Sequence, residues 1–555
     1  MAATPLWFGP EDRPLFGWWH APDDGRARGG VALCPPIGQE YMGTHRTFRL
    51  LAEDLARAGF VALRFDYDGT GDSAGRMIDD GRVGAWSSSV VAAVALLRGA
   101  GLPRLALVGM RLGATLAAVA ASEVGGVDDL VLWDPIRTGR MFVRQQQALA
   151  SLSHQLAGED TLPAGWVEAP AWVFAAETVA ELGQLDMTKT TGTLAGRTLV
   201  LTRPDRPDDE KLRARFGDPG VAWRSATDQA ALIDAIPSQN AVPRAAIADI
   251  VDWLGEADIE PVAVTAPPAV ADEVSHGPAV TERLVRLGPC DLFGIVTEPA
   301  ESGGLTGPTA VFLDVAAEHH VGPARLWVEL ARQWAEAGVR SLRFDLSGLG
   351  DSPSKPGQDD QLMYAPSAID DAIAAVRATS PDDPSDVVLI GLCSGAYVAM
   401  DAADQLHPRG VCALNPVMSY RPNPFAAGPP PARPVLHGVR RRVSPDMYDR
   451  LSRLRFLGRE VVSVALDRLQ RVELPRTVLR RIAAEGTDVL LVAGAQLIAG
   501  PPVPPRAGLL PPAGPKLRVV SPDDLDHSLL ASKPRDRVAQ LLTDHVLRLA
   551  RRDRR

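Results

Sequence analysis

The sequence predicts an α/β protein with two copies of one domain, each a mostly parallel sheet with helices on both faces. Three observations lead to this prediction. Short apolar segments typical of buried strands alternate with helical segments along the chain. Long stretches of the first half recur in the second half. At residues 387–403, an apolar run, a glycine-rich turn and a helix-forming run follow one another directly.

Composition limits the class of protein. A chain of 555 residues is too long for one core, and a net charge of −10 argues against a nucleic-acid partner. No apolar run reaches the roughly 18 residues of a membrane span, and the N-terminal residues lack the pattern of a signal peptide. We therefore expect a cytoplasmic protein with no membrane partner. The four cysteines have no CxxC spacing, so neither a zinc site nor a disulfide framework is predicted.

The internal repeat is clearest where residues 43–73 align without a gap on residues 322–352. Each stretch reads as an amphipathic helix, a glycine turn, a strand that ends in Arg-Phe-Asp, and a loop of the form D-x-x-G-x-G-D-S. The small residues of this loop favour a turn that its aspartates cap, so we interpret it as structural. The match extends to an opening hairpin in each half, and to residues 107–117 and 389–399.

These matches predict the domain boundaries. The two copies span residues 1–257 and 283–555, and the Pro/Ala-rich, acidic stretch at 258–282 reads as a linker. In the second copy a terminal helix is expected at 535–549. The predicted strands of that copy are 309–315, 341–346, 386–391, 410–415, 488–494 and 516–521.

The strand–turn–helix at 387–403 carries the main candidate for catalysis. Gly391, Cys393 and Gly395 fit the nucleophile elbow G-x-S-x-G, with cysteine in the serine position. Glycines are needed there because the nucleophile has a strained backbone and bulky neighbours would collide. The helix that follows directs its N–H groups at the thiol, which predicts a lowered thiol pKa. The simpler alternative is a small buried cysteine at the end of a strand.

With the elbow, the repeat and the strand order together, the chain resembles a tandem α/β-hydrolase. Cysteine at the elbow resembles enzymes of the dienelactone-hydrolase type. The resemblance implies a nucleophile, an acid and a histidine in that chain order. His527, in a loop between the last strand and the terminal helix, lies where the family places its general base. No cofactor is implied.

The acid departs from the family pattern. The strand at 488–494 is followed by Ala-Gln-Leu, and Gln496 cannot carry the charge. Three interpretations stay open. A Cys–His dyad without an acid is preferred, because a thiol at a helix start needs less help than a hydroxyl. Asn415 orienting the imidazole through its carbonyl is second. Asp526 or Asp524, beside the histidine, is third.

The oxyanion hole and the pocket mouth are also inferred from the resemblance. The backbone N–H of Ser394 and that of Ala317 or Glu318 are expected to bind the oxyanion. Glu318, His319 and His320 are then expected at the mouth of the pocket. Two adjacent histidines on a loop are a poor metal site without further ligands, so no metal is predicted.

The first copy lacks the catalytic residues. Arg111 occupies the nucleophile position, and arginine cannot attack a carbonyl group. The loop before its closing helix contains Ser238, Gln239 and Asn240, with no histidine. We predict a pseudoenzyme copy with a structural role; the alternative is that Arg111 binds an anion.

A helical cap is expected at about 418–485, since the segment after the strand at 410–415 is too long for a plain loop. Arginines dominate this segment in a chain that is acidic overall. This basic segment could attract an anionic partner, such as an acyl group bound to coenzyme A or to a carrier protein. The alternative, which we favour, is a solvated arginine-rich face.

The function predicted from these residues is hydrolysis of an activated acyl substrate, namely a thioester, ester or lactone, through an acyl-Cys393 intermediate. His527 takes or holds the thiol proton. Two alternatives stay open. The acyl group could pass to an acceptor other than water, which would make the protein an acyltransferase, or the protein could be a non-catalytic binding or scaffold module.

Overall fold

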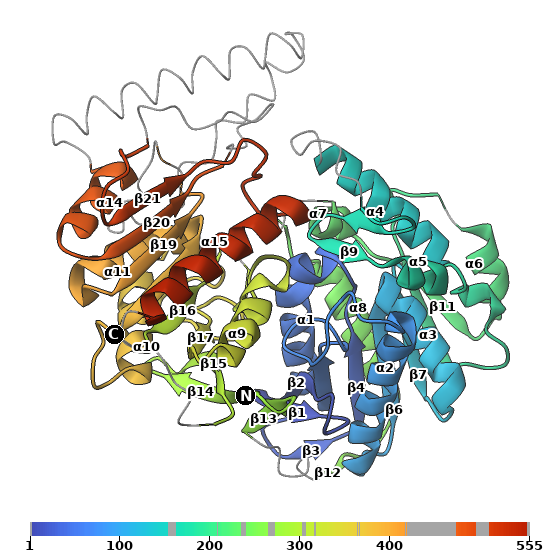
Figure 1. Ribbon diagram of the computed structural model, residues 1–555. Coiled ribbons are helices and arrows are strands. Elements are labelled where there is room, and N and C mark those ends of the chain that lie inside the picture. The colour runs from blue at the N-terminus through green and yellow to red at the C-terminus, as the bar shows by residue number, and fades with distance from the viewer. Residues whose placement is uncertain are drawn as a thin grey trace, which may run out of the picture. The chain divides into compact units, whose positions relative to one another are not determined.

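The computed structural model divides into two compact units, with the division between Gly277 and Pro278 (Figure 1). Residues 3–8 pair antiparallel with residues 15–20, and residues 280–287 pair antiparallel with residues 292–299, which forms the predicted opening hairpin in each copy. The residues described are 3–153, 162–207, 209–234, 240–264, 272–301, 307–315, 318–362, 364–365, 367–416, 418, 473–494 and 510–551.

The first unit alternates strands and helices along the chain. Its sheet has the order β1-β2-β5-β4-β6-β7-β10-β11, and β12-β3 and β8-β9 form separate pairs. The strands are β1 (Ala3–Phe8), β2 (Leu15–His20), β3 (Arg26–Ala27), β4 (Gly29–Cys34), β5 (Phe60–Phe65), β6 (Leu105–Met110), β7 (Asp129–Trp133), β8 (Val167–Ala169), β9 (Trp172–Phe174), β10 (Arg197–Thr202), β11 (Val221–Ser225) and β12 (Val262–Ala263). The helices are α1 (Gln39–Arg57), α2 (Arg82–Gly99), α3 (Leu112–Val124), α4 (Gly139–Ser153), α5 (Ala176–Leu182), α6 (Glu210–Arg215), α7 (Gln229–Ile233) and α8 (Arg244–Gly255).

The second unit repeats this alternation. Its sheet has the order β13-β14-β15-β17-β16-β18-β19-β20-β21. The strands are β13 (Glu273–His276), β14 (Val280–Leu287), β15 (Leu292–Pro299), β16 (Thr309–Leu313), β17 (Ser341–Phe344), β18 (Val387–Leu392), β19 (Gly410–Leu414), β20 (Asp488–Val492) and β21 (Leu517–Val520). The helices are α9 (Leu326–Glu336), α10 (Ala368–Thr379), α11 (Ser394–Leu406), α14 (Pro475–Ala484) and α15 (Ser532–Arg551).

Both sheets have the same topology apart from the edge strand β13. The strands β1-β2-β5 and β14-β15-β17 pair antiparallel, and the neighbours that follow β5 and β17 in the two sheets pair parallel. Parallel neighbours need crossover connections, and the helices that make them cover both faces of the sheet. The predicted α/β fold class is confirmed, and each of the predicted strands of the second copy is present.

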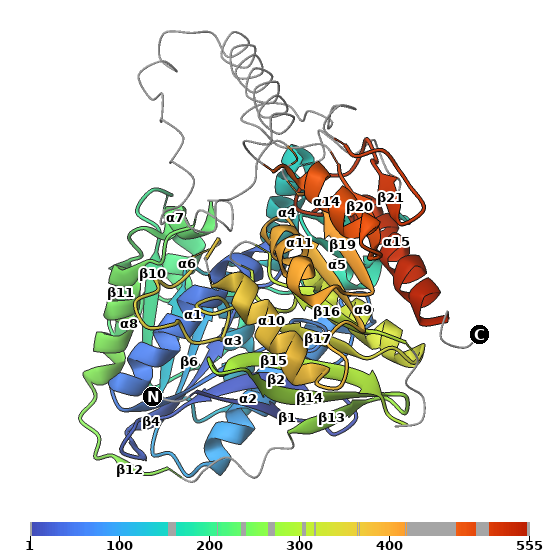
Figure 2. The ribbon, with the colours of Figure 1, turned by 90° about the vertical axis from the view of Figure 1, so that its left-hand side faces the viewer.

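Helices cover both faces of the second sheet (Figures 1 and 2). One apolar cluster joins α9 and α15 to one face, and another joins α10, α11 and α14 to the other face. In β18, Val387 and Leu389 belong to the second cluster, whereas Val388 and Ile390 belong to the first. Successive side chains of a strand point to opposite faces. The continuous apolar run of β18 is therefore explained by a sheet buried on both faces.

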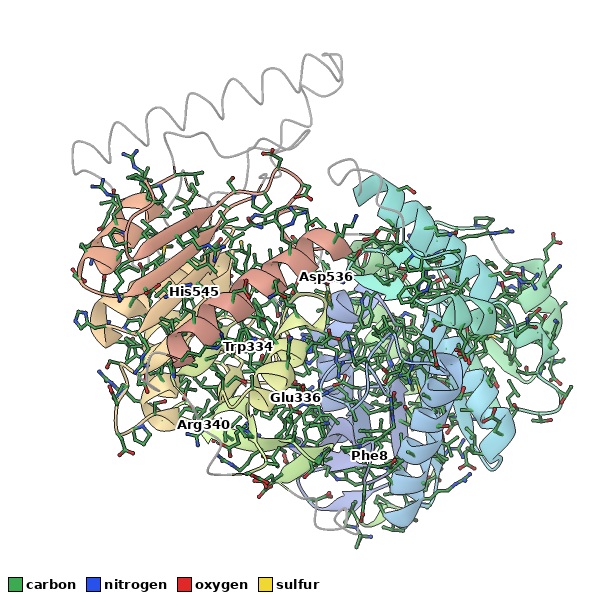
Figure 3. All side chains as sticks on the ribbon, viewed as in Figure 1. Phe8, Trp334, Glu336, Arg340, Asp536 and His545 are labelled. Atoms are coloured by element: carbon green, nitrogen blue, oxygen red, sulfur yellow. The ribbon has the colours of Figure 1, made fainter. Side chains whose placement is uncertain are left out.

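Trp334 ties α9 to α15 (Figure 3). Its ring stacks on Phe312 of β16, with ring centroids 5.4 Å apart. Its indole N–H donates to Thr543 Oγ1 of α15 over 3.0 Å. The terminal helix, which follows the His527 loop, is therefore fixed to the sheet by both apolar packing and a buried hydrogen bond.

The repeated loop has the same hydrogen bonds in both units. Ser352 Oγ donates to Asp345 O over 2.7 Å and accepts the Phe293 N–H over 2.9 Å. Ser73 makes the same two bonds, to Asp66 O and from the Phe16 N–H, at the same lengths. The structural interpretation of this loop is consistent with these bonds.

Two predicted segments lie partly outside the described residues. Of the predicted linker at 258–282, residues 265–271 are not described, and β12, β13 and the start of β14 fall in the remainder. Of the predicted cap at 418–485, residues 419–472 are not described. The described part includes α14, which buries Val478, Leu479 and Ile482 in the apolar cluster under the sheet.

A buried ion-pair network fixes the first strands of the second unit. The Glu282 carboxylate accepts from Arg343 Nη2 over 2.6 Å and from Arg332 Nη2 over 2.8 Å. The Thr297 hydroxyl donates to it over 3.0 Å. Glu282 and Arg343 have no exposed side-chain surface. A buried charge without its partner is far less stable than either the pair or an apolar replacement.

We therefore expect Glu282→Gln to lower the free energy of unfolding of the second unit by about 3–5 kcal/mol, because two arginines lose their buried counter-charge. Urea unfolding followed by circular dichroism measures the change. Glu336→Gln, at an exposed position of α9 (Figure 3), is the control. Equal unfolding curves for the two variants would contradict the prediction.

Candidate active site

Cys393 lies between β18 and α11 with a strained backbone. Its φ is 53° and its ψ −109°, a region that non-glycine residues rarely adopt and that is typical of a nucleophile elbow. A Cβ at Gly391 would lie 2.2 Å from Gly395 O, and one at Gly395 would lie 2.5 Å from Asp314 O. The two glycines are therefore required by the close approach of backbone to backbone.

The thiol of Cys393 is half-buried, and four features act on its pKa. Burial raises the pKa, and the nearby Glu318 carboxyl raises it further. The Tyr364 hydroxyl and the Ser394 N–H interact with the sulfur and lower the pKa, but the net direction is upward. The prediction of a lowered thiol pKa is wrong, because desolvation outweighs the helix start. At neutral pH the thiol is protonated.

Glu318 contributes a second titratable group beside the thiol. Its Oε2 is enclosed and makes no hydrogen bond among the described residues. Burial raises the pKa of its carboxyl to about 8. The Glu318 N–H donates to Val315 O over 2.9 Å. That N–H is thus used within the turn, and Ala317, the other expected oxyanion donor, lies outside the described residues.

His527 lies in the loop between β21 and α15. Burial lowers the pKa of its imidazole, and the Asp526 charge opposes this shift. Leu525 and Leu529, which flank it, belong to the apolar cluster against which Cys393 packs. No hydrogen bond between the imidazole and the thiol is present in the described residues. Such bonds often tighten only when a substrate is bound.

Asn415 links β19, the strand beside the elbow strand β18, to the His527 loop. It follows β19, whose last residue, Leu414, accepts the Cys393 N–H over 2.9 Å. Its Nδ2 donates to the carbonyl oxygens of Asp526 and His527, both over 3.0 Å. Its Oδ1 accepts the Gly494 N–H over 2.7 Å. Both polar atoms therefore bind backbone groups, and the bond partners of Asn415 do not include the imidazole ring.

The two aspartates beside His527 have other partners. Asp526 Oδ1 accepts the N–H groups of Ser528 and Leu530 over 3.0 and 2.9 Å, and its Oδ2 accepts that of Ala531 over 3.1 Å. Asp524 pairs with Arg537 of α15 over 2.7 Å. Asp526 therefore shapes the turn before α15, and Asp524 is tied to the outside of that helix.

The histidine pair is buried. His320 Nδ1 lies 2.9 Å from Asp345 Oδ2, and its backbone N–H donates to Asp345 Oδ1 over 2.7 Å. His319 lies beside it, with ring centroids 5.4 Å apart. His320 thus helps to hold the repeated loop. In the first unit the Tyr41 hydroxyl donates to Asp66 in the same place, over 2.6 Å.

Two residues of the site were missed in the sequence. Tyr364, which reaches the thiol, lies in a loop between β17 and α10 that carries no motif. Asp314 follows β16, and burial, together with the Asp345 charge, raises the pKa of its carboxyl well above its ordinary value. The end of an expected strand could have drawn attention to Asp314, whereas only the fold brings Tyr364 to the elbow.

The first unit has the same backbone at its elbow and different chemistry. Arg111 has φ 58° and ψ −122°. Its guanidinium lies 3.1 Å from the Glu40 carboxylate, 3.2 Å from that of Asp134 and 2.9 Å from Gln145 Oε1. Arg111 is 4% exposed, so a buried ion-pair network occupies the place of a nucleophile.

The loop before α8 in the first unit carries the polar residues that stand where a histidine was expected. Asn240 Nδ2 donates to Gly43 O, and Ser238 and Gln239 lie outside the described residues. In the described part of the chain, no three acidic, histidine or cysteine side chains gather as metal ligands. None of the described helices is long and apolar enough to cross a membrane.

Residues 312–541 match the model of the Alpha/beta hydrolase family. The comparison with curated proteins finds no match. Among solved structures, the chain is similar to Est1E from Butyrivibrio proteoclasticus with bound ferulic acid, at 14% identity over 45% of this chain and 98% of that chain, with a TM-score of 0.35.

The esterase Pf2001 from Pyrococcus furiosus is 17% identical over 46% of this chain and 92% of its own, with a TM-score of 0.31. A putative hydrolase from Agrobacterium vitis S4 is also 17% identical, over 46% of this chain and 98% of its own, with a TM-score of 0.32. The family match falls on the unit that carries Cys393 and His527.

Proposed function

We propose that the second unit hydrolyses an activated acyl ester or thioester through a covalent acyl-Cys393 intermediate. The observation that carries this proposal is the strained backbone of Cys393 at the start of α11, with the Ser394 N–H directed at its sulfur. This geometry presents a nucleophile and an oxyanion donor at one point. The match of residues 312–541 to a hydrolase family supports the same reaction class.

The proposed chemistry begins with a protonated thiol. Neutral His527, whose pKa is lowered, accepts the thiol proton as the sulfur attacks the acyl carbon. The carbonyl electrons move to oxygen, which the Ser394 N–H stabilises, and the leaving alkoxide or thiolate departs with the proton from His527. Water then attacks the acyl-Cys393 carbonyl carbon, gives its proton to His527, and the carboxylic acid is released as the thiol is restored.

The Glu318 carboxyl affects the pH at which the Cys393 thiolate forms. While it is neutral it adds no negative charge beside the sulfur, and once ionised it opposes the thiolate. A cysteine in such a site resists oxidation at rest, because the thiolate is the reactive form. An activated acyl donor suits this nucleophile better than an amide, since a good leaving group lowers the demand for thiolate.

The covalent step is tested by intact mass spectrometry after incubation with p-nitrophenyl acetate or acetyl-coenzyme A. We expect an acetyl adduct on the wild type and on Cys290→Ala, whose cysteine is similarly half-buried. On Cys393→Ala the adduct should be absent, and steady-state hydrolysis should fall by at least about 10³-fold. Acetyl transfer to an added thiol or alcohol without net hydrolysis would instead identify an acyltransferase.

If Cys393→Ala keeps its adduct and its rate, the covalent mechanism is wrong. In that case the alternative of a non-catalytic binding module takes its place.

The pH dependence of Cys393 tests the role of Glu318. Ionised Glu318 raises the thiol pKa, so Glu318→Gln should move the midpoint of iodoacetamide alkylation of Cys393 to lower pH. The alkylation rate is followed from pH 6 to 10 by peptide mass spectrometry. Glu336→Gln, exposed on α9, should alkylate like the wild type. An unchanged midpoint in Glu318→Gln would show that the two groups do not interact.

We further propose that the first unit is structural rather than catalytic. Arg111→Met should lower its free energy of unfolding by about 3–5 kcal/mol, because Glu40 and Asp134 are left buried without a counter-charge. Adding Glu40→Gln and Asp134→Asn should restore much of this loss. Urea unfolding measures both, with Arg140→Ala, at an exposed position, as control. Esterase activity should be unchanged in all of these variants. If small anions stabilise the wild type, the alternative that Arg111 binds an anion is supported instead.

A further inference from the structure

Asn415 and its counterpart in the first unit, Asp134, have the same backbone conformation but different side-chain partners. Asn415 has φ 44°, and its N–H donates to Val492 O over 2.7 Å. Asp134 in the first unit has φ 45°, and its N–H donates to Leu201 O over 2.8 Å. The Asp134 carboxylate faces the Arg111 guanidinium. The Asn415 amide instead faces two carbonyl oxygens and one N–H.

Only an amide satisfies these partners. Nδ2 has two hydrogens, and the carbonyl oxygens of Asp526 and His527 each accept one. Oδ1 accepts the N–H of Gly494, which follows β20. A carboxylate at this position would place negative charge against two carbonyl oxygens with no donor between them. Asn415 is 1% exposed, so water cannot replace the lost bonds without opening the site.

The same bonds fix His527 from one side, and Asp526 fixes it from the other. Asn415 holds the peptide groups at 526 and 527 against the ends of β19 and β20. The Asp526 carboxylate holds the N–H groups of the turn that leads into α15. His527 lies between these two sets of bonds. The backbone that carries its imidazole is thus held on both sides.

We propose that Asn415 is the positioning residue for His527, acting through the backbone of the His527 loop instead of through a carboxylate bonded to the imidazole ring. This inference rests on the proposed function for the role of His527 as a base. It explains how a site without an acid after β20 can hold its histidine. It also explains why asparagine, and not aspartate, follows β19 in this unit.

Asn415→Asp is the sharpest test, because it keeps the size of the side chain and removes the donor. The readout is the pKa of the His527 imidazole, measured by NMR on the full-length protein with ¹³C-labelled histidine and assigned with His527→Gln. In the wild type, burial should hold this pKa below its ordinary value of about 6.5. In Asn415→Asp the loop should open to water, and the pKa should rise to 6.5 or above.

The control is Asp134→Asn, the matched change in the first unit, which should leave the His527 pKa unchanged.

The kinetic counterpart is the rate of Cys393 acylation as a function of pH. In Asn415→Asp its acidic limb should move with the His527 pKa, and kcat should fall by roughly 10–100-fold with KM nearly unchanged. Asn415→Ser, which keeps one weaker donor, should fall between the wild type and Asn415→Asp.

An unchanged His527 pKa in Asn415→Asp, with the variant folded by circular dichroism, overturns the proposal. If Asn415→Asp does not fold, Asn415→Ser decides by the same measurement. The failure of the proposed function looks different: His527→Gln would then leave acylation of Cys393 unchanged, whereas the effect of Asn415 on the His527 pKa would persist.

Discussion

The close approach of backbone to backbone at the elbow is the constraint on which the site depends. Gly391 packs against the first turn of α11, and Gly395 packs against the end of β16. No side chain fits in either contact. The helix therefore starts directly beside the neighbouring strand, and Cys393, between the two, takes strained backbone angles. Everything else at the site is arranged around that thiol.

Burial decides the electrostatics of this arrangement. A helix start by itself favours a thiolate, but the half-buried thiol beside the Glu318 carboxyl keeps its proton. Burial also raises the pKa of Glu318 and lowers that of His527. All three groups are therefore uncharged near neutral pH. In the proposed reaction the thiol therefore gives its proton to the imidazole at the moment when the acyl carbon is attacked.

The two units carry different side chains on the same elbow backbone. The elbow angles of Cys393 and Arg111 differ by little, and the glycines around them meet the same kind of contact. In the first unit a buried guanidinium with two carboxylates fills the place of the nucleophile. In the second unit the thiol of Cys393 takes the place of the guanidinium, and the amide of Asn415 takes the place of the Asp134 carboxylate. The elbow backbone is thus independent of the side-chain chemistry placed on it, because the backbone contacts that define it involve the glycines and not the side chains of Cys393 or Arg111.

The sequence by itself determined the fold class, the repeat, and the positions of Cys393 and His527 along the chain. Strand order and elbow follow from local patterns: continuous apolar runs need a sheet buried on both faces, and glycines at fixed spacing need close backbone contacts. Only the tertiary structure decided which groups surround the thiol. Tyr364 and Glu318 come to it from separate loops, and the bonds of Asn415 go to backbone groups more than 70 residues away. Desolvation reversed the predicted direction of the thiol pKa shift. It depends on packing from all sides of a group, so no local pattern in the sequence predicts it.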